Sequence, residues 1–197
     1  IFGIPGVHNQ EMYRGIEEAG LTHVLARHEE GAGFMADGYA RATGKPGVAY
    51  VITGPGLCNI MTPMGQAYSD SVPMLVITSC LDDVAATRGQ LHQMLDQEGA
   101  AATVCDWSQT ARTAAQAYAL IDRALAEFAA GRKRPKHITV PISVLGALAD
   151  EAPAMAAKLA LPPVADDHGL AAMLAKSKRP LFIFGGGCVA AAAEARE

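Results

Sequence analysis

Short apolar runs alternate along the chain with longer segments in which apolar residues recur at helical spacing. The runs are rich in Val, Ile and Leu and show little polar alternation, which is typical of strands buried on both faces of a sheet. They cover His23–Ala26, Val48–Thr53, Met74–Ser79, His137–Pro141 and Leu181–Phe184. The opening residues, Ile1 to Ile4, read as the tail of one more strand.

The segments between these runs predict helices. They cover about Gln10–Ala19, Glu29–Thr43, Asn59–Ser69 and Ala111–Ala130. A Gly-Lys-Pro sequence directly after Thr43 is a typical helix stop. Strand and helix in regular alternation predict an α/β fold, with an open parallel sheet, right-handed crossovers and helices on both faces.

This alternation breaks near residue 150. Residues 150–168 are rich in Ala and Pro, which indicates a linker between domains. We therefore expect one domain over residues 1–149. Residues 169–197 hold a short helical segment, an apolar run and the triplet Gly185–Gly187, which together resemble the start of a second α/β domain. We expect the chain to be part of a longer protein, because that domain would continue beyond residue 197.

Composition narrows the class of protein. Of the 197 residues 50% are hydrophobic and 18% charged, with a formal net charge of −4, as in a globular protein with a large core. We interpret the single basic cluster, Arg132 to Lys136, as a solvated connection, and expect no nucleic-acid partner. No apolar run predicts a membrane span, and no signal peptide opens the chain. The four scattered cysteines indicate small buried residues in a reducing compartment, hence a cytoplasmic protein.

Three loops that follow predicted strands carry the candidate chemistry, because parallel sheets bind ligands beyond the carboxyl ends of their strands. They are Gly3–Gly6, Arg27–Ala32 and Thr53–Gly56, the last followed by Asn59. Each loop also has a plain structural interpretation. Gly and Pro shape ordinary strand-to-helix turns, and an acidic residue such as Glu29 stabilises a helix N-terminus. None of the loops matches a GxGxxG, Walker, GxSxG or HExxH motif.

Taken in order, however, the loops resemble the N-terminal domain of acetolactate synthases and their thiamine-diphosphate-dependent relatives, the 2-oxoacid decarboxylases. The resemblance spans nearly the whole chain. It rests on Phe2–Gly6, Arg27–Glu29 with Gly31 and Ala32, Ala36–Arg41, Gly44–Gly47, Thr53–Gly56 with Asn59, Asp70–Pro73, Leu91–Gln93 with Asp96 and Gln97, Val140–Pro141, and Gly185–Gly187.

The resemblance implies a cofactor and an assembly. In this family one subunit's N-terminal domain binds the aminopyrimidine ring of thiamine diphosphate, and the partner's C-terminal domain binds its diphosphate through a divalent metal. We therefore expect a homodimer or homotetramer, Mg²⁺ bound by a C-terminal domain beyond this sequence, and no metal ligands within it. FAD, which some relatives contain, would bind in the central domain.

The resemblance also implies roles for individual residues. Glu29 would be the catalytic carboxylate that shares a proton with the pyrimidine ring and so prepares the cofactor to attack a 2-oxo group. Other residues expected at the cofactor are Gly6, Pro55, Gly56 and Asn59. The expected substrate pocket includes Pro5, His92 and Gln93, with a surface-loop histidine as the alternative interpretation of His92.

The implied function is that of a lyase or carboligase acting on 2-oxoacids. Adjacent paired histidines, typical of pyruvate decarboxylases, are not seen, and Ile52 and Thr53 stand where benzoylformate decarboxylases carry a histidine. Both departures favour an enzyme similar to acetolactate synthases or to guanidino-oxopentanoate decarboxylases. An acyl-CoA-type thiamine lyase and a non-catalytic binding module are the remaining alternatives. This chain alone is expected to be inactive.

Overall fold

The computed structural model describes residues 1–82, 88–154 and 168–196. The chain divides into two compact units, Ile1–Leu159 and Ala160–Glu197, which we describe separately. Most of the expected linker over 150–168 lies outside the described residues, so the domain boundaries remain predictions.

The first unit is built on a six-stranded parallel sheet with strand order β2-β1-β3-β4-β6-β5. Its strands are β1 Phe2–Gly3, β2 Val24–Leu25, β3 Gly47–Val51, β4 Met74–Cys80, β5 Trp107–Thr110 and β6 Lys136–Pro141. The expected open parallel sheet is confirmed. Strand β5 was not expected, because its sequence, Trp-Ser-Gln-Thr, contains no apolar run.

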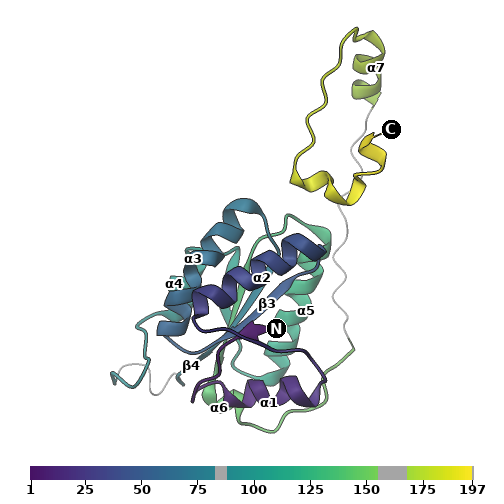
Figure 1. The fold of residues 1–197 in the computed structure, drawn as a ribbon. Helices are drawn as coiled ribbons and strands as arrows, with labels where there is room; N and C mark the ends of the chain where they lie inside the picture. The colour runs from purple at the N-terminus through teal and green to yellow at the C-terminus, as the bar shows by residue number, and fades with distance from the viewer. Residues whose placement is uncertain (83–87, 155–167, 197) are drawn as a thin grey trace. The chain divides into compact units, whose positions relative to one another are not determined.

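Helices cover both faces of this sheet, and β3 shows why. Ala49 and Val51 pack into one core cluster with α2 (Glu29–Thr43), α3 (Pro55–Asp70) and α4 (Gln97–Ala102). Val48 and Tyr50 pack against a second cluster, formed with α5 (Ala114–Ala130). Side chains of a strand alternate between its two faces, so a strand that is apolar at every position must be covered twice. Figure 1 shows α2, α3 and α4 on one side of the sheet and α5 on the other.

The helices of this unit are α1 Gln10–Glu18, α2 Glu29–Thr43, α3 Pro55–Asp70, α4 Gln97–Ala102, α5 Ala114–Ala130 and α6 Ile142–Leu145. Helix α2 ends as expected, at Gly44 in the left-handed conformation with φ 72°. Helix α3 begins earlier than expected because Pro55 takes its first position, which suits proline. No helix within the described residues is long and apolar enough to cross a lipid bilayer.

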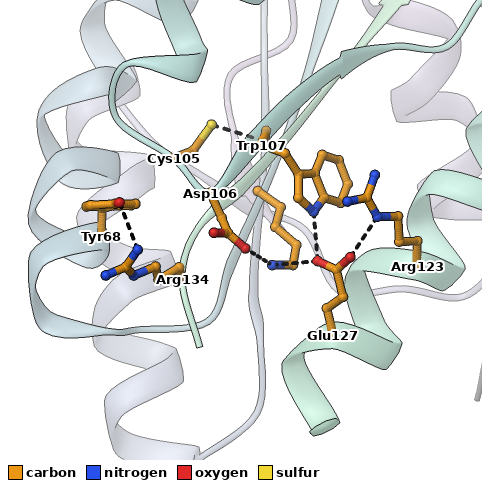
Figure 2. A network of polar contacts seen from close by, with 8 residues as sticks. Tyr68, Cys105, Asp106, Trp107, Arg123, Glu127 and Arg134 are labelled. Carbon is orange, nitrogen blue, oxygen red and sulfur yellow. Dashed lines mark hydrogen bonds and ion pairs between the residues drawn. The ribbon is translucent and has the colours of Figure 1, made fainter. Parts of the chain in front are cut away.

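An ionic and aromatic network joins β5, α5 and the start of β6 (Figure 2). Lys136, only 1% exposed, lies 3.0 Å from the Asp106 carboxylate and 2.9 Å from that of Glu127. Glu127 also accepts hydrogen bonds from the Trp107 indole at 2.7 Å and the Arg123 guanidinium at 2.6 Å. Interpreting the whole basic cluster as solvated was therefore wrong for Lys136, whose charge is matched by carboxylates inside the fold.

The cysteines differ in exposure. Cys105 is buried, Cys80 and Cys188 are half-buried and Cys58 is exposed, and all four are free thiols. Burial raises the pKa of the Cys105 thiol to about 12, so it stays protonated. The expectation that all four are buried was wrong for Cys58, which lies on the outer face of α3.

The second unit contains α7 His168–Lys176 and two 3-10 helices over Gly186–Ala191 and Glu194–Arg196. A short helix was expected here, but the strand expected over Leu181–Phe184 was wrong. These residues are exposed, and the ring of Phe182 stacks on that of Phe184 with the ring planes 6° apart. A strand requires a neighbour for its backbone groups, and the described residues of this unit contain none.

Candidate cofactor site

The site lies where the sheet reverses its winding. Strands β1 and β3 are parallel neighbours, but the helices that follow them pack on opposite faces: Met12 of α1 contacts the α5 cluster, whereas α3 belongs to the other. The connections after β1 and β3 therefore lead in opposite directions, and such a topological switch point is where open α/β sheets bind ligands. Gly6 follows β1 at this point, and Gly54 follows β3.

Glu29 and Asn59 meet close to this switch point. Glu29 is the first residue of α2 and is half-buried, and Asn59 lies in the second turn of α3. The Asn59 amide Nδ2 donates a hydrogen bond of 2.8 Å to Glu29 Oε2. Among the described residues nothing bonds to the other carboxylate oxygen, so it is available to a ligand. Two residues expected at the cofactor are thus in direct contact.

Close packing of α2 on α3 produces this contact. Gly33 of α2 lies against Pro63 of α3, and a Cβ atom on Gly33 would be 2.8 Å from Ile60 Cγ1 and 2.9 Å from Pro63 Cβ. Gly33 follows Glu29 by one helical turn, and Pro63 follows Asn59 by the same interval. The missing side chain at Gly33 therefore sets the distance at which Glu29 and Asn59 meet.

Tyr13 of α1 was missed by the sequence analysis. Its hydroxyl donates a 2.9 Å hydrogen bond to the carbonyl oxygen of Tyr50, at the end of β3. Burial, then the neighbouring Tyr50 and Glu29, raise the pKa of Tyr13 well above its ordinary value. Tyr13 therefore remains a neutral hydrogen-bond donor beside the site. Gly3 leaves room for it, because a Cβ atom there would collide with both the Tyr13 hydroxyl and the Tyr50 carbonyl.

Gln97 holds the loop that begins α3. Its Oε1 atom accepts a hydrogen bond of 3.0 Å from the backbone N–H of Gly54, which has a φ of 61°. Its Nε2 atom lies 2.9 Å from Thr78 Oγ1, 2.8 Å from the Ser79 carbonyl and 2.7 Å from Thr139 Oγ1. All of these groups are buried, so Gln97 anchors the loop to the ends of β4 and β6. The sequence analysis gave Gln97 no such role.

The buried network continues to His137. Its Nε2 atom lies 2.8 Å from the Thr78 hydroxyl and its Nδ1 atom 2.6 Å from the Ser108 hydroxyl. Burial lowers the pKa of His137 to about 3, so the ring is neutral at physiological pH. It serves the fold as an uncharged bridge between β4, β5 and β6.

Of the residues expected at the substrate, His92 and Gln93 line a cavity and Pro5 does not. Pro55, His92 and Gln93 line one cavity of about 520 Å³, and Gln93 also lines a second of about 470 Å³ together with Thr53 and Gln97. Pro5 is exposed in the turn after β1 and lines neither cavity.

The glycines expected at the cofactor share one neighbour. A Cβ atom on Gly6 would collide with Ile52 Cδ1, and one on Gly56 would lie 2.8 Å from Ile52 Cγ2. The Ile52 side chain therefore lies between the loops after β1 and β3. Because Gly6 and Gly56 have no side chains, both loops can pack closely against Ile52.

Comparison with known proteins places the chain in a family. Residues 1–100 match the family model described as thiamine pyrophosphate enzyme, N-terminal TPP-binding domain. The chain belongs to this family. Thiamine pyrophosphate is another name for thiamine diphosphate, so the family resemblance read from the sequence is confirmed.

Several curated relatives of this thiamine pyrophosphate family member are similar over most of its length. A probable 2-ketoarginine decarboxylase of Pseudomonas aeruginosa is 48% identical, over 97% of this chain and 35% of the relative. The acetolactate synthase isozyme 1 large subunit of Escherichia coli is 33% identical, over 100% of this chain and 36% of the relative. A glyoxylate carboligase of Escherichia coli is 34% identical, over 98% of this chain and 34% of the relative. The chain thus spans about a third of these relatives.

The side chains of Glu29 and Asn59 offer the polar groups that a heterocyclic ring of thiamine pyrophosphate would need. The carboxylate of Glu29 has one oxygen held by Asn59 and one available, which suits a ring nitrogen that shares a proton. No group of three or more His, Cys, Asp or Glu residues in the described part of the chain could hold a metal ion.

Proposed function

We propose that this chain is the pyrimidine-binding part of a thiamine-diphosphate-dependent enzyme that decarboxylates 2-oxoacids. The pairing of Glu29 with Asn59 close to the switch point between β1 and β3 is the observation that carries the proposal. A half-buried carboxylate fixed by an amide, with its second oxygen available, can hold a proton at a heterocyclic nitrogen.

Each residue of the site has its own task in the proposed reaction. When bound, thiamine diphosphate supplies an electron sink for the bond between the carboxylate carbon and the 2-oxo carbon. Glu29 holds a proton at the pyrimidine nitrogen through its available oxygen. Asn59 fixes the orientation of that carboxylate, and Gln97 fixes Gly54 and thereby the start of α3. Pro55, Gly56 and Gly6 shape the walls around the ring.

Among 2-oxoacids, 2-ketoarginine is the first substrate to test. The support is the 48% identity to a probable 2-ketoarginine decarboxylase, against 33% to an acetolactate synthase and 34% to a glyoxylate carboligase. Simple decarboxylation is therefore proposed ahead of carboligation, and pyruvate and glyoxylate serve as comparison substrates.

The proposed enzyme is a homodimer or a homotetramer in the cytoplasm. Support for self-association comes from α2, whose Phe34, Met35 and Tyr39 side chains are 38%, 41% and 39% exposed on the helix that carries Glu29. Such an apolar face next to a site is typical of an interface. We propose that Mg²⁺ and the diphosphate are held by a C-terminal domain outside this sequence, and that any FAD would be bound in the central domain.

The test uses the product of the complete gene with thiamine diphosphate and Mg²⁺. Glu29→Gln removes the proton-sharing group but keeps the shape, and we expect CO₂ release from 2-ketoarginine to fall at least about a hundredfold. Glu30→Gln is the matched control, because Glu30 lies in the same helical turn. Its side chain makes no hydrogen bond or ion pair with any of the described residues. It should retain activity within about threefold. Equal activity of the wild type and Glu29→Gln would contradict the proposal.

A further inference from the structure

Three adjacent cations, Arg132 to Arg134, form the turn between α5 and β6, which we call the arginine turn. Arg132 and Lys133 are exposed and Arg134 is half-buried. None of the three forms an ion pair with a described residue, whereas Arg41 and Lys136 are each matched by two carboxylates. Like charges without a counter-charge repel one another, so this turn attracts anions although the chain has a formal net charge of −4.

Hydroxyl groups at the end of α3 hold both arginines in place. The Arg132 Nε atom donates a hydrogen bond of 2.8 Å to Ser71 Oγ, and Arg134 Nη1 donates one of 2.8 Å to the Tyr68 hydroxyl. The Arg134 guanidinium also lies over the Tyr68 ring, 4.2 Å from its centroid (Figure 2). Neutral anchors fix the two guanidinium groups without cancelling their charge. Little side-chain freedom is then left to lose when an anion binds.

Arg134 has one donor edge that no described residue uses. Tyr68 accepts from Nη1, whereas Nε and Nη2 form a second edge whose parallel N–H groups can bind two oxygens of one anion. The Nε atom is buried and has no acceptor within the described residues. Buried donors without an acceptor are rare, and a bound ion is one of the partners that account for them. An anionic oxygen would complete this edge.

The arginine turn is separate from the cofactor site. It precedes β6 and lies against the C-terminal end of α3, whereas the loops of the cofactor site follow the carboxyl ends of their strands. Asn59, which holds Glu29, lies about 14 Å from Tyr68 along the axis of α3. A molecule at the arginine turn therefore leaves the Glu29 carboxylate available to thiamine diphosphate.

We infer that the arginine turn binds a small molecule with adjacent phosphate groups, such as a nucleoside diphosphate or a short polyphosphate. Arg134 binds one phosphate group through Nε and Nη2, and Arg132 and Lys133 bind its neighbour. Guanidinium forks match the geometry of phosphate oxygens. Three cations exceed the single charge of a carboxylate, whereas two linked phosphate groups carry several charges. This binding is independent of the proposed decarboxylation.

A repeated tripeptide supplies the matched control. The sequence Lys-Arg-Pro occurs at Lys133–Pro135 and again at Lys178–Pro180. Arg179 is exposed, and within the described residues no hydroxyl group or aromatic ring anchors it. Arg179→Gln therefore removes the same charge from the same local sequence as Arg134→Gln, but without an anchored guanidinium. Lys133→Gln removes a charge from an exposed side chain that has no described polar contact.

Isothermal titration calorimetry with ADP measures the binding. The complete gene product is first loaded with thiamine diphosphate and Mg²⁺, so that the diphosphate site of the cofactor is already occupied. We expect Arg134→Gln to weaken ADP binding about thirtyfold, because two charge-assisted hydrogen bonds are lost. Arg134→Lys should weaken it about tenfold, since lysine keeps the charge but lacks the fork. Lys133→Gln should weaken it about threefold, and Arg179→Gln should bind ADP as the wild type does.

Two further probes identify the recognised group. Adenosine, which has no phosphate, should not bind. Tripolyphosphate separates the two sources of phosphate: binding as tight as that of ADP assigns a free polyphosphate, and weaker binding assigns a nucleotide. Circular dichroism during urea unfolding checks the fold of each variant. Lys133→Gln keeps the test decisive if Arg134→Gln is unfolded.

Several results would overturn the inference. They are a wild type that binds neither ADP nor tripolyphosphate, equal losses in Arg134→Gln and Arg179→Gln, and adenosine binding as tight as that of ADP. Tighter binding of a polyglutamate peptide or of duplex DNA than of ADP would overturn it too, and would assign the turn to a macromolecular partner. Since CO₂ release is not the readout, a failure of the proposed function would leave all of these outcomes unchanged.

Discussion

Replacing Gly33 with alanine places a methyl group into the closest contact between α2 and α3. The new Cβ would lie 2.8 Å from Ile60 Cγ1 and 2.9 Å from Pro63 Cβ, with Pro63 Cγ nearer still. Carbon atoms prefer a separation of about 3.5–4.0 Å, so the helices would have to separate by about 1 Å. Gly38 on the same helix provides the matched control, since a Cβ there would meet nothing within 4 Å.

The expected magnitude follows from the difference between the two positions. Exchanging glycine for alanine inside a helix stabilises it by about 1 kcal/mol, and this gain is common to both variants. Overpacking costs about 1–3 kcal/mol and applies only at Gly33. We therefore expect Gly33→Ala to be about 2 kcal/mol less stable toward unfolding than Gly38→Ala.

Urea unfolding followed by circular dichroism measures this difference. With a slope of about 2 kcal/mol per M, the unfolding midpoints of the two variants should lie about 1 M apart. Side-chain amide NMR of Asn59 reports on its bond to Glu29, and it should change in Gly33→Ala only. Equal midpoints would refute the inference that Gly33 sets the spacing of the helices.

Three further predictions concern the buried polar groups. Because the pKa of His137 falls from 6.5 to about 3 on folding, the unfolded chain binds more protons between these values, and stability should drop by about 2 kcal/mol from pH 7.5 to 5. His137→Asn should flatten that decline in urea unfolding, and an unchanged slope would count against it. Lys136→Met strips Glu127 of its buried cation and should cost about 3 kcal/mol in the same assay; a loss below about 0.5 kcal/mol would show the ion pair to be dispensable. Gln97→Met leaves the Gly54 N–H unpaired and should cost about 3 kcal/mol, whereas wild-type stability would show that water replaces the amide.

The sequence predicted the parallel sheet because buried strands are apolar at successive positions, a pattern that does not depend on distant residues. It missed β5, whose polar sequence is held by its pairing with β6 rather than by apolar burial on both faces. It wrongly predicted a strand over Leu181–Phe184, because an apolar run cannot show whether a pairing partner exists. Lys136 was misjudged for a similar reason, since its two carboxylates come from other elements.

The candidate site was predictable to the extent that it is carried by single loops. Glu29 and Asn59 stood out through the resemblance, and the structure adds their contact. Gln97, by contrast, acts on Gly54 across a long stretch of sequence, and its role depends on the ends of three strands. The hydrogen bond from Tyr13 to the Tyr50 carbonyl likewise joins two elements that are far apart in the sequence. Such pairings become visible only once the order of strands is known.

Helices α2 and α3 contact each other at three positions along their length. These contacts determine when the entropic cost of fixing the Glu29 side chain arises. Asn59 bonds Glu29 at one end, Gly33 packs on the middle of α3, and at the other end the Arg41 guanidinium donates to Asp70 at 2.7 Å. Conformational entropy lost by Glu29 is therefore lost when the protein folds, not when a ligand arrives. Binding energy from the ligand is then free to act on the reacting bond, and the loops around the site can vary in sequence without disturbing the carboxylate.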